Sequence, residues 1–105
     1  MKYLFNSQGE HIANFVNGEL HAPGGKNIGH YLKDEGIFID LDARYLGEIV
    51  KNDRLMYKIT SSYRQKTFSE QGTHSSVGNY GNPGARTNVG HITGFEDIPE
   101  SRLRP

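Results

Sequence analysis

Three side chains able to bind a divalent metal ion recur at one position of a short sequence pattern. In the stretches NIGH, LGEI and NVGH, the residue beside the glycine on its C-terminal side is His30, Glu48 or His91. Two imidazoles and a carboxylate can hold Zn²⁺ while one coordination position stays open for water. The pattern raises the hypothesis of a metal-dependent hydrolase. The alternative is an ordinary polar face of a small sheet, because a metal site also needs supporting hydrogen bonds that spacing does not show.

A second group of candidate residues is basic and lies mainly in 54–68, RLMYKITSSYRQKTF. This stretch has no acidic residue, and its cationic side chains alternate with aromatic ones, which suits phosphate binding and base stacking. One or two such cations with backbone amides are enough to hold a small anion such as a nucleotide. The candidate ligand-binding residues are Arg54, Lys58, Tyr63, Arg64, Lys66 and, further along the chain, Arg86.

The overall charge and the motifs exclude several function classes. Lys and Arg together number 12, as do Asp and Glu, whereas a dedicated DNA-binding protein relies on an excess of cations. The absence of cysteine excludes disulfides and thiolate metal sites. Neither a phosphate-binding glycine loop with its lysine nor a nucleophile–histidine–acid order is present. We therefore expect no cofactor, no nucleic-acid partner and no enzymatic activity.

The length of the apolar segments indicates in which compartment of the cell we expect the protein. The first residues, MKYLFNSQGE, contain no apolar run of signal-peptide length. No stretch approaches the roughly 20 apolar residues of a membrane helix. We expect a cytoplasmic protein without a membrane partner.

Short strands must position the candidate residues, because no window shows the 3.6-residue apolar period of an amphipathic helix. Turn residues recur at regular intervals. The dipeptide NG at 17–18 is the strongest hairpin signal, because both positions tolerate positive φ. The stretches DEG at 34–36 and ND at 52–53 stand in the same relative places.

An internal repeat of an aliphatic, a small, a polar and a large apolar residue runs through the chain. It occurs as IANF (12–15), IGHY (28–31), LGEI (46–49) and VGHI (89–92), each preceded by a polar turn. In a strand, the small residue shares a face with the large residue two positions on. A glycine there marks a close approach by a neighbouring segment. We expect the glycine to make room for an aromatic ring of a neighbouring unit.

The chain resembles the bacterial four-fold beta flower domain proteins. The resemblance is carried by YLFNSQGEHIANF (3–15), KNIGHYL (26–32), DARYLGEIVKNDRLMY (42–57) and the closing GFEDI (94–98). It implies four β-hairpins around a pseudo-four-fold centre. It brings no established activity, so no functional residue is carried over.

The predicted fold is a single all-β domain spanning residues 1–98. It consists of four short β-hairpin units around a pseudo-four-fold centre, with a long irregular loop between units three and four. The expected bounds are about 3–16, 19–33, 37–51 and 79–95 for the units, 58–79 for an insertion and 99–105 for a C-terminal tail.

The predicted function is a non-enzymatic binding or assembly module. A domain of 105 residues hides a limited share of its surface, and a homo-oligomer is one way to bury more. The Gly-rich stretch 71–88 and the basic stretch 54–68 are the expected contact surfaces. Two alternatives stay open: a protein that sequesters a small anionic ligand such as a nucleotide, and a metal-dependent hydrolase.

Overall fold

The computed structural model describes residues 1–69, 81 and 83–104. Within these residues the chain forms eight β-strands, two 3-10 helices and no α-helix, so the all-β prediction is confirmed. In the described part, no helical segment has the length and apolar character needed to cross a membrane. The elements are β1 (Lys2–Phe5), β2 (His11–Val16), β3 (Glu19–His21), β4 (Asn27–Leu32), β5 (Ile37–Asp40), β6 (Tyr45–Val50), β7 (Arg54–Lys58), η1 (Ser62–Gln65), β8 (Phe95–Asp97) and η2 (Glu100–Leu103).

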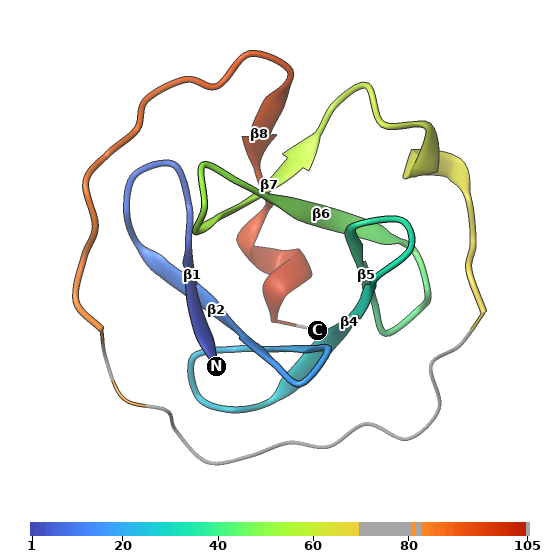
Figure 1. The fold of residues 1–105 in the computed structure, drawn as a ribbon, viewed down its shortest axis with the longest axis horizontal. Helices are drawn as coiled ribbons and strands as arrows, with labels where there is room; N and C mark the ends of the chain where they lie inside the picture. The colour runs from blue at the N-terminus through green and yellow to red at the C-terminus, as the bar shows by residue number, and fades with distance from the viewer. Residues whose placement is uncertain (70–80, 82, 105) are drawn as a thin grey trace.

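Strands β1 to β7 close into a barrel, and β8 is added to β7. Consecutive strands pair antiparallel from β1 to β8. The barrel closes where Phe5 of β1 pairs in parallel with Arg54 of β7. There the N–H of Phe5 donates to the carbonyl of Asp53 at 2.9 Å. Figure 1 shows the strands as a ring, with η2 at its centre.

The first three hairpins share one turn geometry. In each of them, the N–H of the last turn residue donates to the carbonyl of the first, and the last residue has a positive φ, a conformation that glycine adopts at no steric cost. The donor–acceptor pairs are Gly9 to Asn6 at 3.1 Å, Gly25 to Ala22 at 2.8 Å and Ala43 to Asp40 at 3.0 Å.

The same hairpins also share a β-bulge just after the turn. The pairing register shifts between Leu4 and Phe5, between Leu20 and His21, and between Phe38 and Ile39. Each shift leaves one residue of the opposite strand without a partner, which bends that strand and increases its twist. The unpartnered residues are the aliphatic positions of the repeat, Ile12, Ile28 and Leu46. The repeat therefore encodes a bulged hairpin.

The glycine of the repeat makes room for backbone, not for an aromatic ring as expected. A Cβ built on Gly29 would lie 2.3 Å from the carbonyl oxygen of Ile39, and one on Gly47 would lie 2.7 Å from that of Met56. The prediction was wrong because pairing with the next strand brings backbone atoms close, and the one side chain that also approaches is aliphatic, with Ile98 Cδ1 at 2.8 Å from the Cβ built on Gly47.

The arrangement of four hairpins around a pseudo-four-fold centre is not confirmed. Among the described residues of 79–95, only β8 is a strand, and it pairs with β7. Residues 83–92 hydrogen-bond to the first hairpin turn instead, with Arg86 N–H donating to Gly9 at 2.9 Å and Val89 N–H to Ser7 at 2.8 Å. Gly90 has a φ of +68° and no neighbouring atom within 4 Å of a built Cβ, so it is not equivalent to Gly29. Residues 70–80 and 82 of the expected loop lie outside the described residues.

The barrel interior holds the main core, and η2 closes one end of it. Leu103 of η2 is 5% exposed and packs with Ile98 against the strand residues Leu4, Ala13, Leu20, Ile28, Phe38, Leu46 and Leu55. Arg102 fixes the helix by donating to Asp40 Oδ2 at 2.9 Å and to the carbonyl of Tyr45 at 3.0 Å. Residues 99–104 are thus packed against the barrel, where a tail was expected, because Leu103 gains burial there.

A second cluster lies on the outside of the barrel. Ile37, Ile39, Ala43 and Tyr45 are buried beneath Tyr63 and Phe68 of the expected insertion. The N–H of Phe68 donates to the carbonyl of Ala43 at 2.8 Å. The described part of 58–79 therefore covers one outer face of the sheet.

Candidate binding surfaces

The predicted metal ligands His30, Glu48 and His91 are not brought together. His30 is buried in β4, Glu48 is half-buried in β6, and His91 is exposed in a segment without secondary structure. In the part of the chain that the structure describes, no three His, Cys, Asp or Glu side chains are grouped so that they could hold a metal ion. The hydrolase hypothesis therefore gains no support.

The polar position of the repeat has a local role instead. In β2, His11 Nε2 lies 2.6 Å from Asn14 Oδ1. In β6, the Tyr45 hydroxyl donates to Glu48 Oε2 at 2.8 Å. Both bonds join residues three positions apart on either side of the bulge. In these two units the polar residue after the small residue thus hydrogen-bonds within its own strand.

The pKa of Tyr45 departs clearly from its ordinary value. Burial raises the pKa of the Tyr45 hydroxyl, and the adjacent Glu48 carboxylate raises it further, against the lowering effect of the Lys58 N–H. That N–H donates to the hydroxyl oxygen at 3.0 Å. The neutral phenol is therefore part of the folded structure between β6 and β7.

Arg54, a predicted ligand-binding residue, is engaged by the protein itself. It is 5% exposed. Its Nε donates to Asp53 Oδ1 at 2.9 Å, and Nη1 donates to the carbonyls of Thr87 at 2.6 Å and Asn6 at 3.2 Å. A buried guanidinium needs such acceptors. Arg54 fastens the 83–92 segment to the barrel, a structural role where ligand binding was predicted.

The other predicted ligand-binding residues are spread over the surface. Lys58, Arg64 and Lys66 are exposed, and Lys66 Nζ lies 5.2 Å from the ring centre of Phe68. Tyr63 is half-buried and packs on the same ring. Arg86 stacks over Phe5 at 4.6 Å. Three cavities on the described surface have volumes of about 270 to 280 Å³, and none of the six predicted residues lines any of these three.

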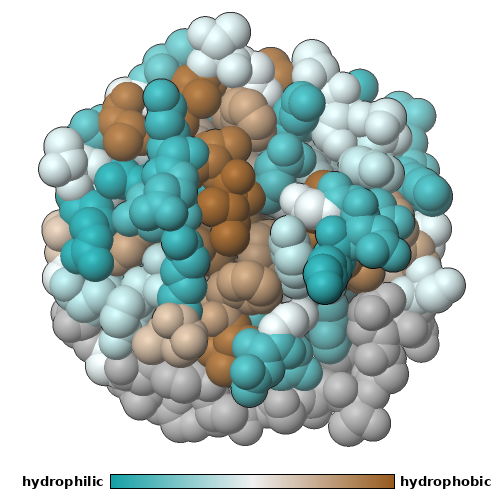
Figure 2. Space-filling view, viewed as in Figure 1, coloured by the Kyte–Doolittle hydropathy of each residue, from teal (hydrophilic) through white to brown (hydrophobic). Residues whose placement is uncertain are grey.

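An apolar surface lies at the barrel end opposite η2, and we call it the mouth. The strand connections at this end are 17–18, 33–36 and 51–53. Phe15 and Tyr31 pack against each other, with ring centres 5.1 Å apart, and both contact the fully buried Phe38. Ile49 holds the equivalent position of the third hairpin and is half-buried like the other two. Figure 2 shows a band of apolar atoms through the centre of the strand ring.

The mouth consists of the large apolar position of the repeat. The sequence pattern identified Phe15, Tyr31 and Ile49 as equivalent, but it did not place them at one end of a closed barrel. The charged residues around them have both signs: Lys2, Lys33 and Lys51 are basic, and Asp34 and Glu35 are acidic.

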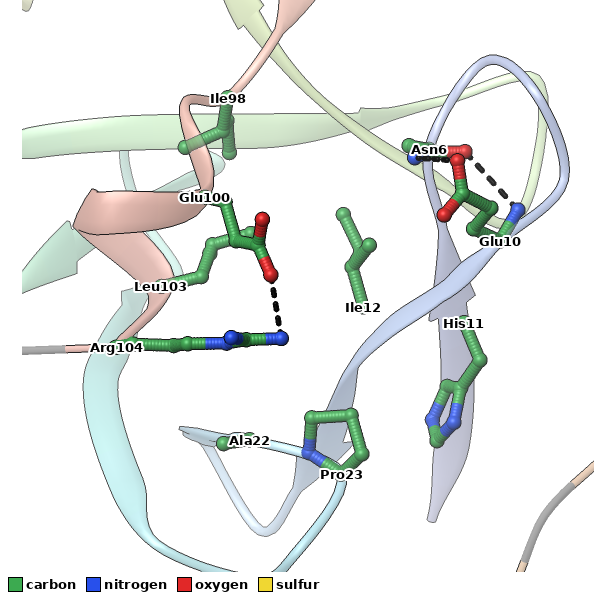
Figure 3. Close-up of a pocket in the computed structure, with 10 residues that line it drawn as sticks. All are labelled: Asn6, Glu10, His11, Ile12, Ala22, Pro23, Ile98, Glu100, Leu103 and Arg104. Carbon is green, nitrogen blue, oxygen red and sulfur yellow. Dashed lines mark hydrogen bonds and ion pairs between the residues drawn. The ribbon is translucent and has the colours of Figure 1, made fainter.

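A cavity of about 270 Å³ lies at the opposite end, beside η2. The β1–β2 turn, the β3–β4 turn and the C-terminal segment enclose it (Figure 3). Its lining includes Glu10, His11 and Ile12 from the first hairpin and Glu100 and Leu103 from η2. No sequence signal joined these segments, because they are distant along the chain.

Both the sequence and the fold of this chain were compared with those of known proteins. The resemblance to the four-fold beta flower proteins stays a prediction. Comparison with protein-family models, with curated proteins and with solved structures finds no match.

Proposed function

We propose that this protein is a non-enzymatic assembly module that forms a homodimer through its mouth. The observation that carries the proposal is the half-buried cluster of Phe15, Tyr31 and Ile49, which sits at equivalent places of three hairpins. Aromatic residues that contact one another and stay partly exposed are typical of the centre of protein interfaces.

A second copy of the chain is the occupant that the mouth fits best. The charges around the mouth are mixed, with Lys33 beside the acidic pair Asp34 and Glu35 in the β4–β5 connection and Lys51 in the β6–β7 connection. In a two-fold symmetric contact, each surface meets its own copy, so a patch with both signs can place its acidic turn against a basic turn. The zero net charge adds no long-range repulsion between copies.

Sedimentation velocity over a range from micromolar to near-millimolar protein tests the proposal. The wild type is expected to shift from monomer to dimer. Tyr31→Gln should remove the shift while circular dichroism shows a retained fold, because it takes away one half-buried ring of the mouth. A wild type that stays monomeric throughout would overturn the proposal.

A pair of charge variants keeps the test decisive if Tyr31→Gln unfolds. Asp34→Lys combined with Glu35→Lys changes two exposed turn residues at the mouth, and it should weaken dimerisation at low salt. Glu10→Lys combined with Asp42→Lys makes the same change of charge at the other end of the barrel and should leave it unchanged. Equal effects of both pairs would contradict an interface at the mouth.

A further inference from the structure

The cavity beside η2 has a rigid apolar floor. Ile12, the bulged residue of β2, lines it together with Ile98 and Leu103. The last two are 6% and 5% exposed and belong to the barrel core. Ala22 and Pro23 of the β3–β4 turn close one side, as Figure 3 shows. A floor held by core residues keeps its shape without a ligand, which lowers the cost of binding.

The polar groups around this floor are mainly hydrogen-bond acceptors. The Glu10 carboxylate is exposed, and Oε1 accepts from Asn6 Nδ2 at a long distance of 3.4 Å. Across the cavity, Glu100 forms an ion pair with Arg104 (Figure 3). Among the described residues that line the cavity, Arg104 is the one cation, and this pairing engages it.

One histidine, His11, is also part of the lining. His11 Nε2 lies 2.6 Å from the amide oxygen of Asn14. An amide oxygen only accepts hydrogen bonds, so Nε2 donates to it and is not free to contact a ligand. Glu10, Glu100 and Arg104 together leave one negative charge at the cavity.

We propose that this cavity binds a small organic cation, an amine or guanidine carried by a short apolar body. The cationic group pairs with Glu10, and the body lies against Ile12 and Leu103. A volume of about 270 Å³ is at the small end of ligand sites, so the body is a short alkyl chain or one aromatic ring. This proposal is independent of dimerisation at the mouth.

Titration of the ¹⁵N-labelled protein with amines, followed by NMR, tests the proposal. Butylamine and phenethylamine are expected to give saturable shifts at residues 10–12, 22 and 98–104, while butyrate gives none. Along the series from methylamine to butylamine, affinity should rise about threefold to fourfold per added CH₂, because each buries apolar surface against the floor. Butyrate binding as tightly as butylamine, or amine shifts that never saturate, would overturn the proposal.

Two variants locate the binding groups. Glu10→Gln removes the charge from an exposed side chain and should weaken butylamine binding on the order of tenfold. Asp42→Asn makes the same change at the same end of the barrel but outside this cavity, and it should bind like the wild type. Equal affinity of the wild type and Glu10→Gln would show that Glu10 is not the partner of the cation.

Discussion

At the scale of single residues, the small position of the repeat is set by backbone approach. Gly29 pairs with Asp40 in the β4–β5 ladder, and the carbonyl of Ile39 occupies the space of a Cβ. The sequence showed that a small residue was required there. It did not show what approached it, because strand register depends on the neighbouring strand.

Gly29→Ala should destabilise the protein strongly. The added Cβ meets a backbone oxygen 2.3 Å away, and backbone moves only at the expense of the ladder, so a loss of about 2 to 3 kcal/mol is expected. Gly24→Ala is the matched control, because no atom lies within 4 Å of its built Cβ and its φ is not positive. Urea unfolding of both variants measures the difference. Similar midpoints for the two would contradict the proposed role of Gly29.

Because of Tyr45, we expect the stability of the fold to change with pH in the alkaline range. Burial raises the pKa of its hydroxyl in the folded state, whereas the unfolded chain titrates near the ordinary value of about 10. A group with a raised folded pKa contributes stability below the unfolded pKa and loses it as pH rises above that value. The expected loss is about 1.4 kcal/mol per pH unit above pH 10.

Comparison with Tyr45→Phe isolates this effect. The variant lacks the hydroxyl that bonds Glu48 and the Lys58 N–H, so it should be less stable at neutral pH by about 1 to 3 kcal/mol. Its deficit should shrink above pH 10, because only the wild type loses the contribution of the hydroxyl. Unfolding free energies measured from pH 7 to pH 11 give the two curves. A deficit that stays constant to pH 11 would exclude a raised pKa.

At the scale of elements, the local signals predicted the hairpins and missed the long-range contacts. The NG turn at 17–18 has positive φ at both residues, as its type requires. The pattern VGHI suggested a fourth strand at 89–92, but the backbone there bonds the first hairpin turn. A four-residue match is weak where the partner is about 80 residues away in sequence.

The C-terminal helix η2 is expected to stabilise the barrel as a plug. Leu103→Ala removes a side chain that is 5% exposed and should cost about 2 kcal/mol or more. Ser101→Ala, an exposed position of the same helix, is the control and should lie within about 0.5 kcal/mol of the wild type. Thermal unfolding should place Leu103→Ala at least about 8 °C below the control. Equal melting temperatures would show that 99–104 is an unimportant tail.

At the scale of the whole molecule, barrel closure separates two ends with different chemistry. One end carries the apolar mouth around Phe15 and Tyr31, and the other carries η2 and the acidic cavity at Glu10. In the first three units, the repeat predicted which residues are equivalent. It could not predict this division, because closure through Phe5 and Arg54 and plugging by Leu103 depend on contacts between distant segments. For the same reason, Arg54 looked like a ligand-binding residue in the sequence and is buried in the structure.

A dilution series of ¹⁵N-labelled protein followed by NMR tests assembly through the mouth most directly. If the mouth is the interface, concentration-dependent shifts will be confined to Phe15, Tyr31, Ile49 and the adjoining connections 17–18, 33–36 and 51–53. The turns at 6–9 and 22–25, at the other end, should keep constant positions. Spectra that do not change with concentration, or changes centred on those two turns, would contradict the proposed assembly.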